Sequence, residues 1–486
     1  MQTFSTSFHK SFEGAILNQR LSKSRYLVII ERKESGEAFF YHSLFGNLHS
    51  VPSDYIGVID LFAAPLSRSE AHLRLVDFKV PGKLIEEFLE LYYLVPEGFD
   101  ERSLTQHELS QRGERLQTGE LINAIQLNVS EGCNLKCSYC FADRVDERAT
   151  LYNLKARNDQ RMMTFETAVK SVLEVTNLAK SNGGGALVIK FFGREPLLNW
   201  EVINGVIDHC ESSGQDFSYH YAITTNGTLF TPEIVRKLKR VNTSIVVSLD
   251  GFSEGNALRV THMGKETFSA VDKGLQLLKE HDIHSCVASV LSDRNFNALG
   301  DDFIDYLKER KVKQWEVKLA MQNDGLLQHS PTQYAEKLLH LYKKGKDSGI
   351  AVTGDWYDPF ATLFHTTKFT TDNRVQRLAP NNCSATDHQI SVEPGGGIFG
   401  CRALDRRLGS VDDLPSLFQS AAYKHLSMRT YYNVPFCHGC KLEGFCQGVC
   451  LGHSEKKFND IYKPDNDYCE VYRKVFDLLL LNYSRD

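Results

Sequence analysis

The chain has 486 residues, of which 42% are hydrophobic and 24% charged, and its formal net charge is −5. This length allows two or three domains with sizeable cores, and the lack of a basic excess argues against nucleic acid or an anionic membrane as a general partner. No apolar run approaches the roughly 20 residues that span a bilayer. The N-terminal segment lacks the continuous apolar core of a secretory signal, so we expect a cytoplasmic protein.

The first zone, residues 1–118, is expected to place strands before helices. Segments Tyr26–Ile30 and Ala38–Tyr41 are strand-like. Apolar segments follow at Tyr55–Phe62 and Leu84–Leu94, the second with helical periodicity. This order of elements suits a winged-helix-like module, and a plain structural cap on the next domain is the alternative.

A polar segment, Asp100–Glu120, leads into the middle zone, residues 119–325, where strands and helices alternate. The expected strands are Ile122–Val129, Ala186–Phe192, Ser218–Thr224, Ser244–Leu249, Ser285–Val290 and Gln314–Ala320. Helices are expected between them at Phe165–Ala179, with Thr164 as N-cap, and at Pro232–Lys239, Phe268–Lys279 and Phe303–Arg310. Six βα units predict an α/β fold in which a parallel sheet curls into a partial (β/α)6 barrel. Its site would lie at the C-terminal ends of the strands.

Three cysteines stand close together just after the first strand of this zone. Cys133, Cys137 and Cys140 have the spacing C-x3-C-x2-C. Three thiolates leave one iron of a [4Fe–4S] cluster without a protein ligand, and an open iron can bind a substrate or cofactor. The alternative is a zinc site, but zinc sites favour paired C-x2-C units that close to four ligands. The spacing, with Tyr139 just before the last cysteine, resembles that of the radical S-adenosylmethionine (SAM) enzymes.

This resemblance implies both cofactors and chemistry. In that family SAM chelates the open iron, and one electron from the cluster cleaves it to a 5′-deoxyadenosyl radical that abstracts a hydrogen atom from the substrate. The cofactor carries the radical step, while the protein orients and shields it. An electron donor such as flavodoxin or ferredoxin is therefore an expected partner.

Further segments at strand ends resemble motifs of the same family. F-F-G-R-E-P-L (191–197) is similar to the GGEP motif, with Arg194 in place of the second glycine; T-T-N-G (224–227) is similar to the TNG turn near the SAM ribose; and S-L-D-G (248–251) is similar to the S-[IL]-D-G motif. For Glu195 and Arg259 the alternatives are a salt-bridged surface carboxylate and a surface ion pair. The SAM-binding residues that the resemblance implies are Tyr139, Gly193, Glu195, Thr225, Asn226, Ser248 and Arg259.

The last zone, residues 380–486, holds seven of the twelve cysteines. A hairpin is expected between His388–Glu393 and Ile398–Arg402, and a closing helix over Asp467–Tyr483. Linker helices are expected over residues 326–379.

The cysteine spacing of this last zone resembles the SPASM domain, a module with two auxiliary [4Fe–4S] clusters. The family's interleaved ligation implies that Cys383, Cys401 and Cys450 hold the first auxiliary cluster, and Cys437, Cys440, Cys446 and Cys469 the second. The first then has three cysteines and an unassigned fourth ligand, whereas the second is closed, as suits an electron relay. The alternative is a zinc ribbon. The resemblance thus implies three [4Fe–4S] clusters and SAM in all.

Two cysteines, Cys210 and Cys286, fall outside these groups. A lone cysteine usually behaves as a small buried hydrophobe, and a hydrogen-atom donor is the alternative. The sequence assigns no catalytic base.

SPASM-bearing radical SAM proteins act mostly on peptide or protein side chains. The resemblance therefore implies a radical SAM oxidoreductase that installs a thioether or carbon–carbon crosslink on a ribosomal precursor peptide. The N-terminal module would bind the leader peptide by β-augmentation. The alternatives are a peptide epimerase, an anaerobic sulfatase maturase and an iron–sulfur electron carrier. A sulfatase maturase has an Asp directly after the cysteine that matches Cys401, where this chain has Arg402, and the open cysteine triad argues against a mere electron carrier.

Overall fold

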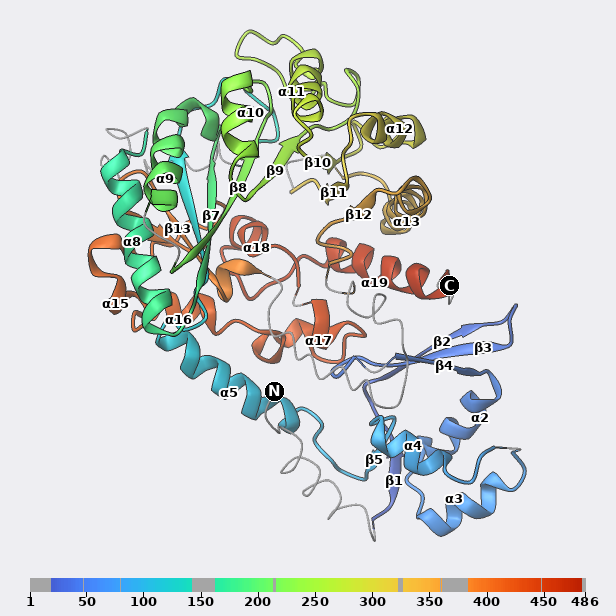
Figure 1. The fold of residues 1–486 in the computed structure, drawn as a ribbon. Coiled ribbons are helices and arrows are strands. Elements are labelled where there is room, and N and C mark those ends of the chain that lie inside the picture. The colour runs from blue at the N-terminus through green and yellow to red at the C-terminus, as the bar shows by residue number, and fades with distance from the viewer. Residues whose placement is uncertain are drawn as a thin grey trace.

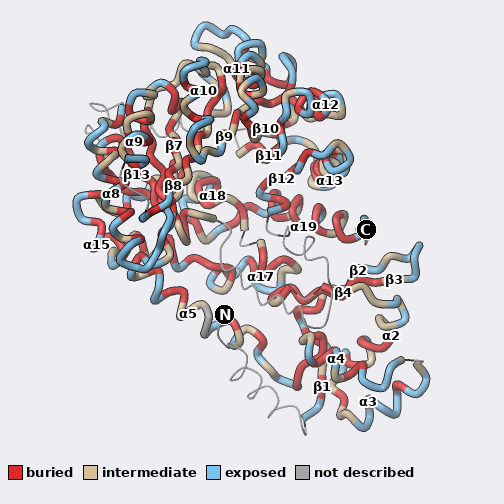
Figure 2. Tube along the Cα trace, viewed as in Figure 1, coloured by how far each residue is buried: buried red, intermediate tan, exposed pale blue. Residues whose placement is uncertain are grey.

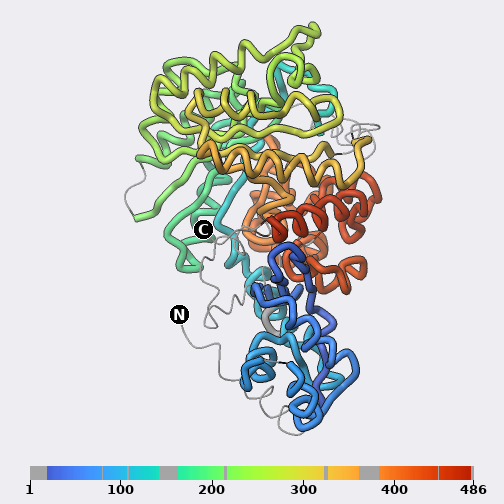
Figure 3. The backbone as a smooth tube through the Cα atoms, turned by 90° about the vertical axis from the view of Figure 1, so that its right-hand side faces the viewer, coloured from blue at the N-terminus to red at the C-terminus, as the bar shows by residue number. Residues whose placement is uncertain are grey.

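The computed structural model describes residues 19–46, 48–78, 80–141, 162–212, 216–321, 327–358, 360, 383–446 and 448–482. An N-terminal module, a sheet covered by helices and a cysteine-rich unit follow one another along the chain (Figure 1). The cysteine-rich unit lies between the other two, as the view in Figure 3 also shows. Among the described helices, none combines the length and the apolar character that a membrane span requires.

The N-terminal module places strands before helices, as predicted. Its antiparallel sheet consists of β2 (Leu27–Arg32), β3 (Glu37–His42) and β4 (Leu48–Pro52). The helices α2 (Asp54–Asp60), α3 (Arg68–Leu75) and α4 (Leu84–Glu90) follow, and β1 (Leu21–Lys23) pairs with β5 (Leu94–Pro96). Side chains alternate along β3, so that Phe40 packs on Phe88 of α4 while Tyr41 contacts Phe445 and Phe476 of the cysteine-rich unit. Both faces of this small sheet are therefore covered.

The polar segment before the middle zone contains a helix that its composition does not indicate. This helix, α5 (Ser103–Gln117), buries Leu116 completely. The buried guanidinium of Arg112 donates hydrogen bonds to the carbonyls of Ser427 (3.1 Å) and Thr386 (2.9 Å) in the cysteine-rich unit. Tertiary contacts thus stabilise a helix that lacks a clear apolar stripe.

The middle zone forms the predicted parallel sheet. Its strands are β6 (Ala124–Ser130), β7 (Ala186–Gly193), β8 (Ser218–Thr225), β9 (Thr243–Ser248), β10 (Ser285–Leu291) and β11 (Gln314–Leu319). The covering helices are α8 (Phe165–Ser181), α9 (Trp200–Ser212), α10 (Pro232–Lys239), α11 (Phe268–Glu280), α12 (Asp301–Glu309) and α13 (Pro331–Ser348). Thr164 caps α8, as predicted, by accepting a hydrogen bond from the Thr167 amide. Alternate strand residues pack against these helices, and buried residues accordingly follow the strands in Figure 2.

The sheet extends beyond the six predicted strands. Among the described residues it has ten strands in the order β12-β11-β10-β9-β8-β7-β6-β13-β14-β15. The strand β12 (Ala351–Thr353) joins β11 in the region where only linker helices were expected. The predicted hairpin is present as β13 (Gln389–Val392) and β14 (Gly397–Phe399), followed by β15 (Gly409–Ser410), and β13 also pairs in parallel with β6. The cysteine-rich unit is thus joined to the strand that precedes Cys133.

The rest of the cysteine-rich unit consists of short helices and one long closing helix. The short helices are α15 (Leu414–Leu417), α16 (Ala421–Ser427), α17 (Glu443–Cys446) and α18 (Leu451–Phe458). The closing helix, α19 (Asn466–Leu481), agrees with the prediction, although Tyr483 lies outside the described residues. Because α19 carries Cys469 and also packs beside α13, it connects the cysteine-rich unit to the last covering helix of the sheet.

Candidate functional site

Three cysteines face one another on the loop after β6, at the carboxyl edge of the sheet. The Cys133 and Cys137 thiols interact electrostatically with each other and with Cys140. The pKa of Cys137 is raised to about 11, mainly by burial; Arg259 lowers it, and the other two thiols add to the rise. When ionised, three neighbouring thiolates repel one another, and a bound cationic group offsets this repulsion. The three thiols are therefore suited to ligate iron of a cluster.

The cysteine loop is held by the chain that follows β9. The amide of Lys136 donates to the Val260 carbonyl (2.7 Å), and the amide of Ser138 donates to the Leu258 carbonyl (3.1 Å). A ring nitrogen of His262 lies 2.9 Å from the Cys133 carbonyl oxygen. The three cysteines are therefore fixed by backbone contacts between two strand ends, which keeps their relative positions defined.

The end of β7 approaches this loop so closely that only glycine fits. Gly193 has a φ of +128°, and a Cβ there would lie 2.3 Å from the Ser130 carbonyl oxygen. The amide of Arg194 donates to the same carbonyl (2.9 Å), and Arg194 is not among the residues with positive φ. Arginine is therefore tolerated in place of the second glycine of the motif, because its position needs a backbone donor and not a left-handed conformation.

Glu195 is fully buried beside the cysteine loop and is not a surface carboxylate. Its Oε1 accepts hydrogen bonds from the Leu197 amide (3.0 Å) and the Thr225 hydroxyl (2.6 Å), and its Oε2 accepts one from the Asn226 amide (2.8 Å). Burial raises the pKa of Glu195, and these three hydrogen bonds oppose the rise. The carboxylate is thus held in one orientation by two strand ends.

The substitution Glu195→Gln is expected to weaken SAM binding. It keeps the shape of the side chain but removes the charge proposed to bind the SAM amino group. Loss of a charge-assisted hydrogen bond costs about 1.5–3 kcal/mol, which corresponds to roughly ten- to hundredfold weaker binding. Calorimetric titration of the anaerobically reconstituted protein with SAM measures the change. Glu201→Gln, at an exposed position of α9, is the matched control; equal affinities for the two variants would refute the role of Glu195.

A turn after β8 connects Glu195 to the cysteine loop. Asn226 donates from Nδ2 to Oδ1 of Asn134 (2.8 Å), and the same nitrogen lies 3.8 Å from the Cys133 sulfur. Ser248, another predicted contact, is the last residue of β9 and pairs in register with Ala288 of β10. All these residues therefore lie at the edge of the sheet where the prediction put them.

Arg259 and Tyr139 share a partner that sequence reasoning missed. Arg259 forms a buried ion pair, not a surface one: its Nε donates to Oδ2 of Asp250 (2.9 Å), which also accepts from the Tyr139 hydroxyl. Oδ1 of Asp250 accepts from the Val290 amide (2.8 Å). Asp250 belongs to the S-L-D-G motif, which marked this segment as part of the site. Nothing in the sequence indicated that Asp250 holds Tyr139 beside the last cysteine of the triad.

The seven C-terminal cysteines form the two groups that the resemblance implied. In one group Cys401 interacts electrostatically with Cys383 and Cys450, and burial raises the pKa of Cys383 to about 11. In the other, burial raises the pKa of both Cys437 and Cys469 to about 12. A cavity of about 320 Å³, part of it open to solvent, is lined by Phe436, Cys437, Cys440, Leu442, Glu443, Cys446, Gly448, Cys469 and Arg473. The second group thus surrounds a space with four thiols.

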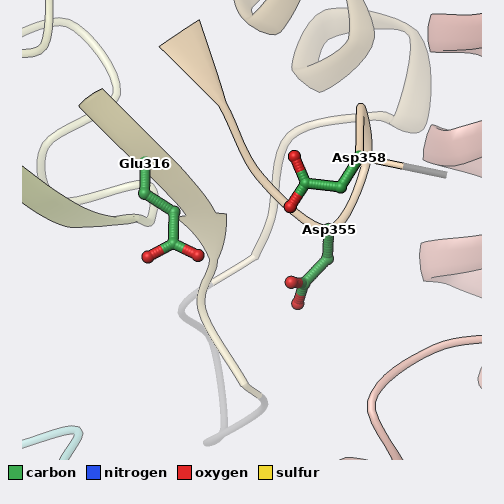
Figure 4. A group of neighbouring side chains, drawn as sticks. All are labelled: Glu316, Asp355 and Asp358. Atoms are coloured by element: carbon green, nitrogen blue, oxygen red, sulfur yellow. The ribbon is translucent and has the colours of Figure 1, made fainter. Parts of the chain in front are cut away.

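A group of carboxylates, which the sequence did not indicate, lies at the far end of the sheet. Glu316 of β11 and Asp355 and Asp358 of the loop after β12 have carboxylate oxygens within 4.8 Å of one another (Figure 4). The Lys318 ammonium lies 3.0 Å from Glu316 Oε1. Asp358 is exposed, but nearby protein atoms desolvate its carboxylate, and this effect, followed by the negative charges of Asp355 and Glu316, raises its pKa to about 6.

Asp358→Asn is therefore expected to stabilise the fold in a pH-dependent manner. The folded-state pKa lies above the ordinary value, so the stabilisation from Asp358 is present below about pH 4 and is lost as the pH rises through about 6. Asparagine stays neutral at every pH, so the gain in melting temperature of the variant over the parent should be largest at pH 8 and should shrink steadily as the pH falls from about 6 toward about 4. Thermal unfolding of the two proteins across this range measures the difference. Asp305→Asn, at an exposed position of α12, is the control; a gain independent of pH would contradict the assignment.

Together, the fold and the site define a class of protein: a partial barrel of parallel strands with an open cysteine triad after its first strand. The family model of the radical SAM superfamily matches residues 127–295. The radical SAM cyclopropyl synthase TigE of Paramaledivibacter caminithermalis is 30% identical over 469 residues, which are 96% of this chain and 97% of TigE. The chain therefore belongs to the radical SAM superfamily. A cysteine-type anaerobic sulfatase-maturating enzyme of Clostridium perfringens is 25% identical over 369 residues, 72% of this chain and 93% of that enzyme.

Solved structures share the fold. The structure of native anSMEcpe with bound AdoMet matches this one with a TM-score of 0.59 at 22% sequence identity. The match covers 74% of this chain and 97% of the anSMEcpe chain. The structure of SuiB of Streptococcus suis bound to S-adenosylmethionine matches with a TM-score of 0.52 at 16% sequence identity. This match covers 91% of this chain and 99% of the SuiB chain. Both the family and these structures support a [4Fe–4S] cluster and SAM as cofactors. The facing thiols and the close approach at Gly193 fit these cofactors.

Proposed function

We propose that this enzyme is a peptide maturase that installs an oxidative crosslink, carbon–carbon or thioether, on a ribosomally made precursor peptide. The observation that carries the proposal is the match over 97% of TigE, an enzyme named as a cyclopropyl synthase. A cyclopropyl ring is closed by a carbon–carbon bond, so this relative favours the carbon–carbon form. SuiB, which shares the fold, has been solved with its precursor peptide SuiA, and this supports a peptide as substrate.

The ligands at the barrel would be Cys133, Cys137 and Cys140, and the bound cluster and SAM would together supply the 5′-deoxyadenosyl radical. In this proposal Glu195 binds the SAM amino group, while Gly193 lets the backbone approach the cofactor. Asp250 positions Tyr139 and Arg259 at the same site. Thr225, Asn226 and Ser248 complete the SAM contacts from the ends of β8 and β9.

A crosslink removes two hydrogens from the peptide. One leaves as an atom, which converts the 5′-deoxyadenosyl radical to 5′-deoxyadenosine, and the other leaves as a proton and an electron. That electron needs an acceptor, and the two C-terminal cysteine groups are proposed to hold two auxiliary [4Fe–4S] clusters that accept it. Epimerisation is redox-neutral and needs no such acceptor, so the cysteine groups favour crosslinking.

The residue after Cys401 disfavours formylglycine formation. Arg402, only 3% exposed, donates to Glu393 Oε1 (3.1 Å) and Oε2 (3.0 Å) and to Glu131. A guanidinium held between two carboxylates does not replace the aspartate base expected there in a sulfatase maturase.

The N-terminal module is proposed to bind the leader part of the peptide. Because both faces of the β2-β3-β4 sheet are covered, its edges remain for pairing with an added strand. The strand β2 lies beside α19, so β4 offers the more open edge. A precursor peptide without its leader should bind the full-length enzyme at least about tenfold more weakly in a fluorescence anisotropy titration; undiminished affinity would assign the module a purely structural role.

The proposed function is tested by the intact mass of a precursor peptide encoded beside this gene, after anaerobic co-expression with the enzyme. A peptide lighter by two hydrogens, and unchanged with Cys140→Ala, is the expected result. An unchanged mass with deuterium uptake from solvent would instead indicate epimerisation.

A further inference from the structure

A crosslink releases a proton from the peptide, and this proton needs an acceptor. Arg402 occupies the position of the aspartate base expected in a sulfatase maturase, and a guanidinium does not accept a proton. An acceptor has to lie at the carboxyl edge of the sheet, where the radical is proposed to form, and it has to present an unoccupied basic atom. A group of four side chains at this edge meets both conditions: Asp293, Phe296, His329 and Tyr334.

The turn after β10 places Asp293 at this edge. Asn295 donates from Nδ2 to the Asp250 carbonyl (3.2 Å), and its Oδ1 accepts from the Ser292 amide (2.8 Å). Asp250 is the residue that also accepts from the Tyr139 hydroxyl. The turn that carries Asp293 is therefore joined by hydrogen bonds to the site where SAM is proposed to bind.

Asp293 holds the imidazole of His329, which lies just before α13. Oδ1 of Asp293 is the hydrogen-bond partner of His329 Nδ1 and also accepts from the Tyr334 hydroxyl. Desolvation raises the pKa of Asp293, but the hydrogen bonds from Tyr334 and His329 outweigh it and hold this pKa below its usual value. Because an ionised carboxylate only accepts hydrogen bonds, Nδ1 carries the ring proton and Nε2 is the basic nitrogen.

The basic nitrogen of His329 is open. No described residue is a hydrogen-bond partner of Nε2, and the side chain is 30% exposed. The Phe296 ring stacks on the imidazole with centroids 4.0 Å apart and planes 8° from parallel. The ring is thus fixed in its plane by Phe296 and in its rotation by Asp293, while one nitrogen remains available to a substrate.

Helix capping does not account for this pair. The helix α13 has a capping box of its own, in which Ser330 accepts from the Gln333 amide (3.3 Å) and the Gln333 side chain accepts from the Ser330 amide (2.9 Å). The pairing of Asp293 with the His329 ring is therefore not needed to begin the helix.

The charged and titratable groups around the imidazole come from two elements. Asp293 comes from the turn after β10, and Tyr334 and Lys337 come from α13. The Lys337 ammonium lies 5.6 Å from the centroid of the Phe296 ring, whereas the Asp293 carboxylate contacts the imidazole directly. A carboxylate in direct contact favours the protonated form of the ring once a proton has been accepted.

We propose that His329 is the catalytic base of the crosslinking reaction and that Asp293 is its positioning residue. This inference rests on the proposed function, from which it takes the peptide, the radical and the electron acceptor. The 5′-deoxyadenosyl radical takes one hydrogen atom from a C–H bond of the peptide. As the new bond forms, a second C–H or S–H bond breaks. Its proton passes to His329 Nε2, and the remaining electron passes to an auxiliary iron–sulfur cluster.

The test compares His329→Gln with His340→Gln in the full-length enzyme, reconstituted anaerobically, reduced and supplied with SAM and a precursor peptide encoded beside this gene. His340 is the matched control, because it also lies on the α13 segment and pairs with an aspartate (Nε2 to Asp301 Oδ1, 2.8 Å), but at an exposed position. A general base contributes about 10²- to 10⁴-fold, so His329→Gln should form crosslinked peptide at least about a hundredfold more slowly while 5′-deoxyadenosine still forms. His340→Gln should form both products at the rates of the parent.

The pH profile separates a base from a structural residue. In the parent, the amount of crosslinked peptide per 5′-deoxyadenosine should fall at low pH, where the imidazole is already protonated. This acidic limb should be absent in His329→Gln. Asp293→Asn removes the charge that favours the protonated ring, so its acidic limb should move to lower pH.

Three outcomes would overturn the inference. If the parent crosslinks the peptide and His329→Gln does so at the same rate and with the same pH profile, His329 is not the base and the proposed function stands. If His329→Gln loses 5′-deoxyadenosine together with the crosslink, its role is structural. If the parent itself leaves the peptide unaltered, the proposed function fails and the inference fails with it.

Discussion

Cys140→Ala is expected to reduce the formation of 5′-deoxyadenosine from SAM to the level of a reaction without enzyme. The triad supplies only three thiols, and a loop with two would not hold the cluster that delivers the electron. Cys140 also follows Tyr139, which is tied to Asp250, so the loop backbone should stay in place when the thiol is removed. The measurement is chromatographic quantification of 5′-deoxyadenosine after anaerobic reconstitution and chemical reduction.

The control for this prediction is Cys286→Ala, which removes a thiol from β10 outside all three cysteine groups. This variant should keep SAM cleavage at the level of the unsubstituted enzyme. Cleavage retained in Cys140→Ala would mean that the triad is not the site of SAM cleavage, whereas its loss in both variants would indicate a general effect of thiol removal on folding.

Cys383→Ala is expected to spare much of the SAM cleavage and to abolish the crosslinked product. Cys383 belongs to a group held by β14, α18 and the chain before β13, whereas the triad lies on the loop after β6. Hydrogen-atom abstraction would therefore still occur, but the electron left on the peptide would lose its acceptor. The ratio of 5′-deoxyadenosine to crosslinked peptide, measured by mass spectrometry, should rise by at least about tenfold. This corresponds to a change of about 1.4 kcal/mol in the free-energy difference between the step that forms the crosslink and the steps that do not.

Cys210→Ala is the matched control, since it removes a buried thiol from α9 without touching a cysteine group. It should leave the ratio of the two products unchanged. If Cys383→Ala gave as much crosslinked peptide per SAM cleaved as this control, the first auxiliary cluster would have no role in the reaction.

Local patterns of the chain were sufficient to predict the barrel and the positions of its cofactor motifs. The strands of the middle zone alternate with amphipathic helices, and each motif directly follows an apolar strand. Because the carboxyl ends of parallel strands share one edge, motifs such as the cysteine triad and the G-R-E-P segment had to meet there. The structure brings Thr225 and Asn226 into direct hydrogen-bonding contact with Glu195, as this argument requires.

Features that depend on contacts between distant segments could not be predicted. The pairing of β13 with β6 joins residues more than 260 positions apart, for example Ile390 with Ile125. The polar helix α5 is stabilised by Arg112, whose partners lie in the cysteine-rich unit. Likewise, Asp355 and Asp358 meet Glu316 only because β12 adds a strand beyond β11. Neither the hydrophobic periodicity of the sequence nor the spacing of its cysteines indicates which distant segments come into contact.

The most direct test of the central claim, that the SAM-derived radical takes a hydrogen atom from a peptide, is the fate of a deuterium label. The reconstituted and reduced enzyme is incubated with SAM and with a precursor peptide whose carbon-bound hydrogens are replaced by deuterium. Our account predicts that the 5′-deoxyadenosine formed carries one deuterium and that its amount matches that of the crosslinked peptide. Unlabelled 5′-deoxyadenosine beside an unaltered peptide would show that this peptide is not the hydrogen donor and would contradict the account.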